Sequence, residues 1–299
     1  MIRNIFLLVL SALAVWSCTA TDDEIAQGPA ADTRPAGAQR SLSIIIAPKP
    51  AFTEVGGENS PTTRAVQTEQ GTQWEQGDVV WLDGVIQDSY DNQYSFRSAL
   101  KYTGTVWRHL TEAEATEMGL NNDNRFNRTL ILSDGYAVVT ISGYYAGNGK
   151  PENGLITIPA PGSDAAVPVM WAAGKLSAQD GSWSLTFTYR CSRLRIPAGY
   201  GLQMTNYGYC ASYRLFSGYF EQTYATDLQL PAADKDRDVF LLPVADDNGT
   251  PVLAPVTLTR NGSAVWTFTP EPAGSVSGYY GRSYTLPEVG SGGVTPGDL

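Results

Sequence analysis

The amino-acid sequence predicts an all-β protein with two β-sandwich domains. Its length of 299 residues exceeds that of a typical single domain, and its apolar content of 42% suffices for two hydrophobic cores. Charged residues make up only 17%, whereas 30 glycines, 16 tyrosines and 7 tryptophans are typical of short strands joined by turns. Apolar segments recur roughly every 8 to 15 residues between Gly, Asn and Asp turns, as they do in β-sandwiches.

The composition disfavours several classes of function. The formal charge of −10, without any basic block, provides no electrostatic attraction for a nucleic acid. A single histidine, His109, and three cysteines are too few for a transition-metal site or a histidine-based catalytic triad. Adjacent carboxylates such as Asp246 and Asp247 lie in polar loops, where acids usually stabilise turns. We therefore expect no enzymatic activity, no cofactor, no metal and no nucleic-acid partner.

Residues 1–17 form a predicted secretory signal peptide. The apolar run over 5–16 is too short to span roughly 30 Å of hydrocarbon as a helix. It ends at Ser17-Cys18, which resembles a bacterial lipobox, so Cys18 is the predicted lipidation site. An ordinary signal peptide with an incidental cysteine is the alternative. The acidic run at 22–24 resembles the export signal of Bacteroidetes surface lipoproteins, so we expect an outer-membrane lipoprotein exposed at the cell surface.

The segment behind the signal peptide contains a linker, a strand and a loop. Residues 18–40 are rich in Ala, Gly, Pro, Asp and Thr without a hydrophobic period, which predicts a flexible linker. Residues 42–47 are apolar and largely β-branched and precede two prolines, so they predict a short strand. Residues 51–73 are polar and Gly-rich, and they place Arg64-Ala65 in a loop that we expect to be open to proteases.

A break at residues 159–163, rich in proline and glycine, marks the predicted domain boundary. The N-terminal β-sandwich domain is expected over 41–163 and the C-terminal one over 164–299. Apolar or alternating residues predict the strands of the first domain over 79–82, 94–102, 128–132, 137–141 and 155–158.

The first domain also contains one predicted helix, over residues 111–118. Thr111 and Glu114 form a capping box, in which each side chain binds a backbone N–H of the first turn. Gly119 ends the helix.

The second domain contains the clearest amphipathic strand of the chain, over 183–190. The apolar positions then change parity, which predicts a bulge or bend near Ser192. Asn261-Gly262 is a favoured hairpin dipeptide, so it predicts a hairpin between two of the remaining strands. These strands are expected over 168–172, 239–242, 256–259 and 265–268.

Two groups of side chains in the second domain have two interpretations each. Cys191 and Cys210 could form a disulfide in an oxidising compartment, and two buried free thiols are the equal alternative. Between 200 and 224 the chain carries eight aromatic residues. Aromatic rings stack on sugars and anchor protein interfaces, but they also pack in cores. The candidate ligand surface consists of Tyr207, Tyr209, Tyr213 and Tyr219.

The order of these features resembles the fimbrillin-like proteins of Bacteroidales, the subunits of type V pili. The features are the lipobox, the short strand, the loop with Arg-Ala, and three sequences, which are Trp74-Glu75-Gln76-Gly77-Asp78, Gly143-Tyr144-Tyr145 and Ser192-Arg193-Leu194-Arg195. The resemblance covers roughly residues 1–290. It implies two tandem transthyretin-like β-sandwiches and a pilus subunit whose partners are other fimbrial subunits.

The resemblance also implies a mechanism of assembly. A trypsin-like protease would cut between Arg64 and Ala65 and remove a strand containing Leu42, Ile44, Ile45 and Ile46. A strand taken from a sandwich exposes unpaired amides and an apolar groove, and a strand of a neighbouring subunit restores both.

The role within a fimbria is left open by residues 287–299, which are Gly-rich and contain proline and so make a poor donor strand. A donor around 282–286, a tip or accessory subunit, and an uncut anchor are the remaining alternatives. The competing function is a lipid-anchored binding module that does not polymerise and that holds a host glycan or protein through its aromatic residues.

Overall fold

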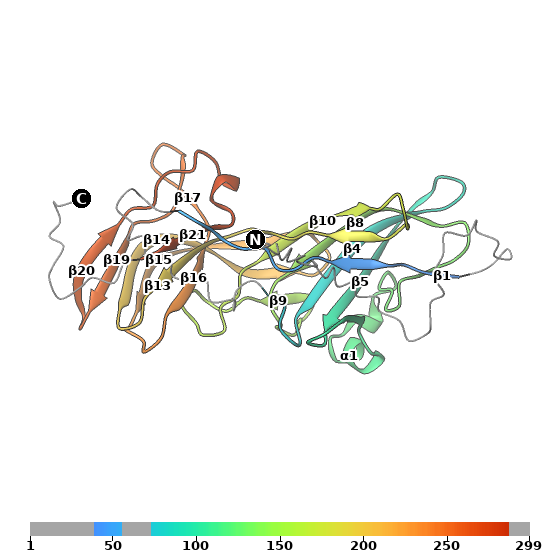
Figure 1. Cartoon of the computed structure of the whole chain (residues 1–299), viewed down its shortest axis with the longest axis horizontal. Coiled ribbons are helices and arrows are strands. Elements are labelled where there is room, and N and C mark those ends of the chain that lie inside the picture. The colour runs from blue at the N-terminus through green and yellow to red at the C-terminus, as the bar shows by residue number, and fades with distance from the viewer. Residues whose placement is uncertain (1–38, 56–72, 287–299) are drawn as a thin grey trace, which may run out of the picture.

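The computed structural model describes residues 39–55 and 73–286, and within these ranges the protein is nearly all β, as predicted. Cys18, Arg64-Ala65 and residues 287–299 lie outside the described residues. The molecule is elongated, with one group of sheets at each end of its long axis (Figure 1).

The largest sheet has eight strands and forms one half of the molecule. In spatial order its strands are β2 (Ile44–Ile46), β11 (Trp183–Leu185), β10 (Met170–Leu176), β8 (Ala137–Tyr145), β4 (Val79–Gln87), β5 (Gln93–Tyr102) and β6 (Trp107–His109), and β12 (Thr188–Tyr189) also pairs with β10.

This sheet is buried on both faces along β4. Val80 and Leu82 belong to one hydrophobic cluster, whereas Val79 and Trp81 belong to another on the opposite face. Because successive side chains of a strand point to opposite faces, a strand covered on both sides needs a continuous apolar run. This explains the uninterrupted apolar sequence over 79–82.

Two further sheets enclose the core of the other half. One contains β16 (Arg237–Leu241), β13 (Ser192–Ile196), β21 (Arg282–Thr285) and β3 (Thr53–Glu54). The other contains β15 (Tyr219–Leu230), β14 (Gly201–Arg214), β19 (Val256–Arg260) and β20 (Ser263–Phe268), with β9 (Leu155–Thr157) paired to β14. Side chains of both sheets share one buried cluster, which contains Leu194, Tyr284, Leu202 and Leu258.

The remaining elements are short. Strand β1 (Arg40–Ser41) pairs with β7 (Ile131–Leu132), and β17 (Val244–Ala245) pairs with β18 (Pro251–Val252). Besides the helix α1 (Glu112–Glu117), two 3₁₀ turns occur among the described residues, η2 (Leu120–Asn122) and η3 (Ser277–Tyr279).

The sheet topology places the change between the two halves later than the boundary predicted at residue 163. Strands β10, β11 and β12 continue the first sheet, because β10 pairs with β8. The chain enters the second half between β12 and β13, close to Ser192. The change of apolar parity that predicted a bulge there therefore marks the passage from one sheet to another. Strand β9 precedes this point in the chain but already belongs to the second half, since it pairs with β14.

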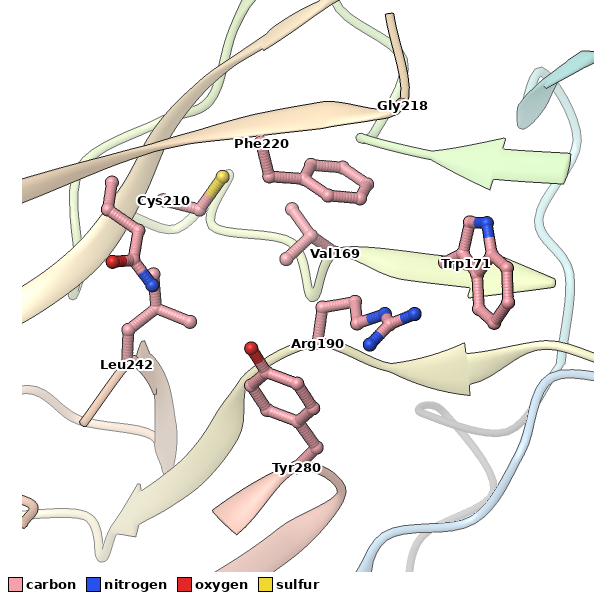
Figure 2. A pocket seen from close by; sticks show the side chains of 9 residues that line it. Val169, Trp171, Arg190, Cys210, Gly218, Phe220, Leu242 and Tyr280 are labelled. Atoms are coloured by element: carbon pink, nitrogen blue, oxygen red, sulfur yellow. The ribbon is translucent and has the colours of Figure 1, made fainter. Parts of the chain in front are cut away.

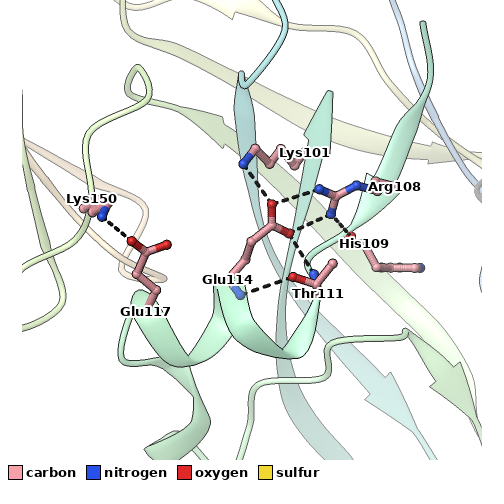
Figure 3. Close-up of polar contacts among 7 residues, drawn as sticks. All are labelled: Lys101, Arg108, His109, Thr111, Glu114, Glu117 and Lys150. Atoms are coloured by element: carbon pink, nitrogen blue, oxygen red, sulfur yellow. Dashed lines mark hydrogen bonds and ion pairs between the residues drawn. The ribbon is translucent and has the colours of Figure 1, made fainter. Parts of the chain in front are cut away.

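Helix α1 begins as predicted, with Thr111 as N-cap and a complete capping box with Glu114. The Glu114 carboxylate also accepts hydrogen bonds from Arg108, at 2.7 and 2.8 Å, and from Lys101 at 2.8 Å (Figure 3). The Arg108 hydrogen bonds lower the pKa of Glu114 well below its usual range. Glu114 thus fixes the helix onto strands β5 and β6.

Replacing Glu114 by glutamine is expected to lower the free energy of unfolding at pH 7 by about 2 kcal/mol, because hydrogen bonds to charged groups are lost. A carboxyl whose pKa is lowered by folding stabilises the protein above its unfolded pKa of about 4.3, and this contribution is lost as pH falls further. The difference in free energy of unfolding between the wild-type protein and Glu114→Gln, measured by urea unfolding, should therefore decrease from pH 7 to pH 3. Glu117→Gln is the control, because the pair of Glu117 with Lys150 is exposed and such pairs contribute at most about 1 kcal/mol. Equal losses in both variants would contradict the prediction.

Candidate functional site

The candidate site is the groove that holds residues 39–55, here called the N-terminal segment. The segment runs along the molecule from one group of sheets to the other (Figure 1). Its strand β1 pairs with β7, β2 pairs in parallel with β11 at the edge of the largest sheet, and β3 pairs in parallel with β21 at the edge of a second sheet. The segment therefore completes sheets in both halves.

Strand β2 confirms the strand predicted over 42–47. Ile44 is buried in the core of the first half, while Leu42 and Ile46 pack against the same core with partial burial, and Ile45 is half-buried. The backbone N–H of Trp183 donates to the carbonyl of Ser43 at 2.9 Å. These contacts are those of an edge strand with one apolar anchor.

Phe52 is a second anchor, which the sequence did not indicate because Phe52 is a single aromatic residue in a stretch without a hydrophobic period. Its side chain is buried, and its ring stacks on Tyr189 with the centroids 3.7 Å apart. The guanidinium of Arg193 lies 4.7 Å from the Phe52 centroid. The Tyr189 hydroxyl donates to the carbonyl of Pro50 at 2.7 Å.

Lys49 forms a buried ion pair with Asp78 across this groove. Lys49 Nζ lies 2.8 Å from Asp78 Oδ2, and the two side chains are 9% and 1% exposed. Asp78 also accepts hydrogen bonds from the Tyr145 hydroxyl and from the backbone N–H of Glu75, both at 2.8 Å. Burial, followed by the charge of Asp78, raises the pKa of Tyr145 well above its usual value, so its hydroxyl stays protonated.

Residues 74–78 supply most of the groups that surround Lys49. The indole N–H of Trp74 donates to the carbonyl of Ala47 at 2.8 Å, and Lys49 Nζ lies 5.0 Å from the centroid of the Trp74 ring. Gly77 has φ of +99°, a conformation that a side chain would disfavour, in the turn that leads to Asp78. The motif noted in the sequence is thus a binding site for the N-terminal segment.

The far end of the segment is held by Arg193. Its Nη2 lies 2.8 Å from Glu54 Oε1, and its Nε donates to Ser283 Oγ at 3.0 Å. Thr285 Oγ1 donates to the other Glu54 oxygen at 3.0 Å. A cavity of about 360 Å³ lies beside the segment, lined by Lys49, Phe52 and Asp78 among others.

The predicted aromatic ligand surface is not one surface. Tyr213 is fully buried and Tyr207 nearly so, and both belong to hydrophobic cores, so for these two the second interpretation that the sequence left open, core packing, holds. Tyr209 is half-buried, and only Tyr219 of the four is largely exposed, at 59%. A bulge between Cys210 and Ser212 interrupts the alternation of side chains along β14 between Tyr209 and Tyr213.

A second cavity, of about 430 Å³, lies beside the hairpin of β14 and β15. Arg190 projects between the rings of Trp171 and Tyr280, with its guanidinium carbon 4.5 and 5.6 Å from their centroids (Figure 2). Within residues 39–55 and 73–286, no carboxylate forms an ion pair with Arg190. Phe220 and Gln222 also line this cavity.

Cys191 and Cys210 are buried free thiols, the second of the two alternatives that the sequence left open. Burial raises the pKa of each thiol to about 12. We expect both to resist alkylation by iodoacetamide at pH 8 in the native protein, because the thiolate is the nucleophile. Both should react rapidly in urea, and peptide mass mapping measures this. A Cys191–Cys210 cross-linked peptide in the unreduced protein would contradict the free-thiol state.

Neither a metal centre nor a membrane-spanning helix is found in the part of the chain that the structure describes. No group of three or more His, Cys, Asp or Glu side chains there is arranged to hold a metal ion. No helix in those ranges is both long and apolar enough to cross a bilayer. The lone histidine, His109, is half-buried, and burial lowers its pKa.

Comparison with solved structures finds similar chains, two of which are at low sequence identity. No protein-family model and no curated protein matches the chain. A "putative cell adhesion protein" from Bacteroides thetaiotaomicron VPI-5482 has a TM-score of 0.38 and 12% identity, covering 87% of this chain and 98% of its own. A second "putative cell adhesion protein", from Bacteroides fragilis NCTC 9343, has a TM-score of 0.30 and 11% identity, covering 82% and 91%. Likenesses at these scores carry no argument about function.

Proposed function

We propose that the protein is a structural subunit of a cell-surface fimbria, exported as a lipoprotein precursor and assembled by strand exchange after its N-terminal segment is removed. One observation carries this proposal. Residues 39–55 complete the edges of sheets in both halves of the molecule, through parallel pairing of β2 with β11 and of β3 with β21. Removing them would expose unpaired backbone groups together with the apolar surfaces that Ile44 and Phe52 cover.

Cleavage after Arg64 is the step that would release the segment. Arg64 follows residue 55 in the chain, so cutting there separates all of β1, β2 and β3 from the remaining sheets. Cutting at Arg34 or Arg40 would free the lipidated end at Cys18 and leave β2 and β3 in place. A strand from another subunit would then bind by β-strand addition, in which main-chain hydrogen bonds provide affinity and side-chain pockets provide specificity.

The N-terminus of the mature protein at the cell surface tests this function. Intact mass and N-terminal peptide analysis should show a start at Ala65, and the variant Arg64→Gln should keep the segment and form no fimbriae. Arg40→Gln is the matched control, because it removes an equal charge from the same part of the chain and should assemble normally. An acylated Cys18 as the only mature N-terminus would contradict the proposal.

The cavity around Arg190 favours a second candidate function, a lipid-anchored module that binds acidic sugars. The Arg190 guanidinium, which pairs with no carboxylate of the described residues, can bind an acidic sugar's carboxylate through two hydrogen bonds, and the neighbouring aromatic rings can stack on the sugar. Glucuronate should then quench tryptophan fluorescence at concentrations at least tenfold lower than glucose. Arg190→Gln should abolish this difference, while Arg260→Gln should keep it, because Arg260 lies over Tyr200 elsewhere. Equal binding of both sugars would exclude this function.

A further inference from the structure

We propose that the strand that replaces the N-terminal segment must place a lysine or arginine side chain against Asp78, where Lys49 lies in the uncut chain. This inference rests on the proposed strand exchange and adds a chemical requirement to the partner. Asp78 is 1% exposed and is paired with Lys49 at 2.8 Å. When the segment leaves, this cation leaves with it.

The groups that stay behind cannot neutralise Asp78. The Tyr145 hydroxyl and the Glu75 backbone N–H remain, but both are neutral donors. Four other cations line the same cavity, and each keeps another partner after the segment has left. Arg193 loses Glu54 with the segment but still lies 3.8 Å from Asp238 and donates to Ser283 Oγ at 3.0 Å. Arg195 pairs with Asp238 at 3.0 Å, and Lys235 forms an exposed pair with Asp164 at 3.4 Å. Arg237 donates to the carbonyls of Pro231 and Tyr200. An occupant without a cation would therefore enclose an unpaired carboxylate, which is strongly unfavourable.

The surroundings of Asp78 also favour a cation in an extended strand. Lys49 Nζ lies 5.0 and 4.8 Å from the ring centroids of Trp74 and Tyr145, and aromatic faces attract ammonium groups. The indole of Trp74 holds the carbonyl of Ala47, two residues before Lys49. The site therefore recognises a backbone carbonyl and a cationic side chain at a fixed spacing.

This requirement describes the partner strand and disfavours one candidate. The partner should carry a lysine or arginine with an apolar residue five positions before it, as Ile44 precedes Lys49, and an aromatic residue three positions after it, as Phe52 follows. Residues 287–299 contain Glu288 and Asp298 but no lysine or arginine. Their charge would be repelled by Asp78, so the donor strand lies outside residues 287–299 and carries a cation in this register.

The experiment uses the full chain with a specific protease site inserted after Arg64. After cleavage, fluorescent peptides compete with the N-terminal segment for the groove, and anisotropy gives their relative affinities. The peptides are residues 39–55, the same peptide with Lys49→Met, Lys49→Arg or Arg40→Met, and residues 284–299. Arg40→Met is the matched control, because it removes an equal charge at an exposed residue of the same segment.

We expect the unmodified, Lys49→Arg and Arg40→Met peptides to bind within about tenfold of one another. The Lys49→Met peptide should bind at least 100-fold more weakly, and residues 284–299 should not compete. If the Lys49→Met peptide binds as well as the unmodified one, the charge requirement is wrong while strand exchange stands. If not even the unmodified peptide enters the groove, strand exchange itself fails, and the requirement fails with it.

Discussion

Replacing Lys49 by methionine is expected to lower the free energy of unfolding of the uncut chain by about 3–5 kcal/mol. Methionine keeps most of the side-chain volume but leaves Asp78 charged and buried, with Tyr145 and Glu75 as its remaining hydrogen-bond donors. Removing one partner of a buried pair has this large effect because the other charge loses its compensation without regaining water. Urea unfolding at pH 7 measures the change.

Two variants decide whether the loss comes from the unpaired charge. Adding Asp78→Asn to Lys49→Met should recover part of the stability, because the amide retains hydrogen-bonding groups without the charge. Lys150→Met is the matched control, because its pair with Glu117 is exposed and should contribute at most about 1 kcal/mol. A loss below about 1 kcal/mol in Lys49→Met would show that Asp78 is compensated in another way.

Replacing Tyr213 by alanine is expected to lower the free energy of unfolding by about 3–5 kcal/mol, the range for deletion of a large aromatic side chain from a core. Tyr213 is fully buried, and its ring lies 5.4 Å from Tyr144 and 5.0 Å from Phe220. Within the described residues its hydroxyl makes no hydrogen bond of full geometry and interacts only with the backbone of Phe216. Tyr213→Phe should therefore change the free energy of unfolding by less than about 1 kcal/mol, because at most one weak interaction is lost.

Tyr219→Ala provides the comparison for this prediction. Tyr219 is 59% exposed at the start of β15, and substitutions at such positions usually change stability by less than about 0.5 kcal/mol. Thermal or urea unfolding of the three variants separates a core role from a surface role. If Tyr213→Ala lowered the free energy of unfolding as little as Tyr219→Ala does, a core role for Tyr213 would be wrong and it would again be a candidate for the ligand surface.

The elements that the sequence predicted well are those whose signals are local. The capping box of Thr111 and Glu114 contains both partners of its hydrogen bonds within four residues, so helix α1 begins where predicted. The hairpin at Asn261-Gly262 joins β19 and β20 because both residues adopt the positive φ that its turn requires. Strand β2 follows from an apolar run that ends before prolines.

The candidate site was predicted only in part, for a related reason. The apolar run around Ile44 indicated a strand, but Phe52 and Lys49 lie among polar residues and prolines that carry no periodic signal. Their importance comes from Tyr189 and Asp78, which are 137 and 29 positions away in the chain. Contacts between residues so far apart depend on the order of the strands in the sheets, and neither composition nor periodicity specifies that order.

The sequence by itself determined the all-β class, the helix, the hairpin and the apolar character of strands such as β4, because each depends on neighbours a few residues apart. Only the tertiary structure decided that β10, β11 and β12 belong to the first sheet, that β3 completes a sheet of the second half, and that Tyr207 and Tyr213 are core residues. Hydrogen bonds between distant strands fix these assignments. For the same reason only the structure pairs Lys49 with Asp78, since a buried charge requires its partner in space and not in sequence.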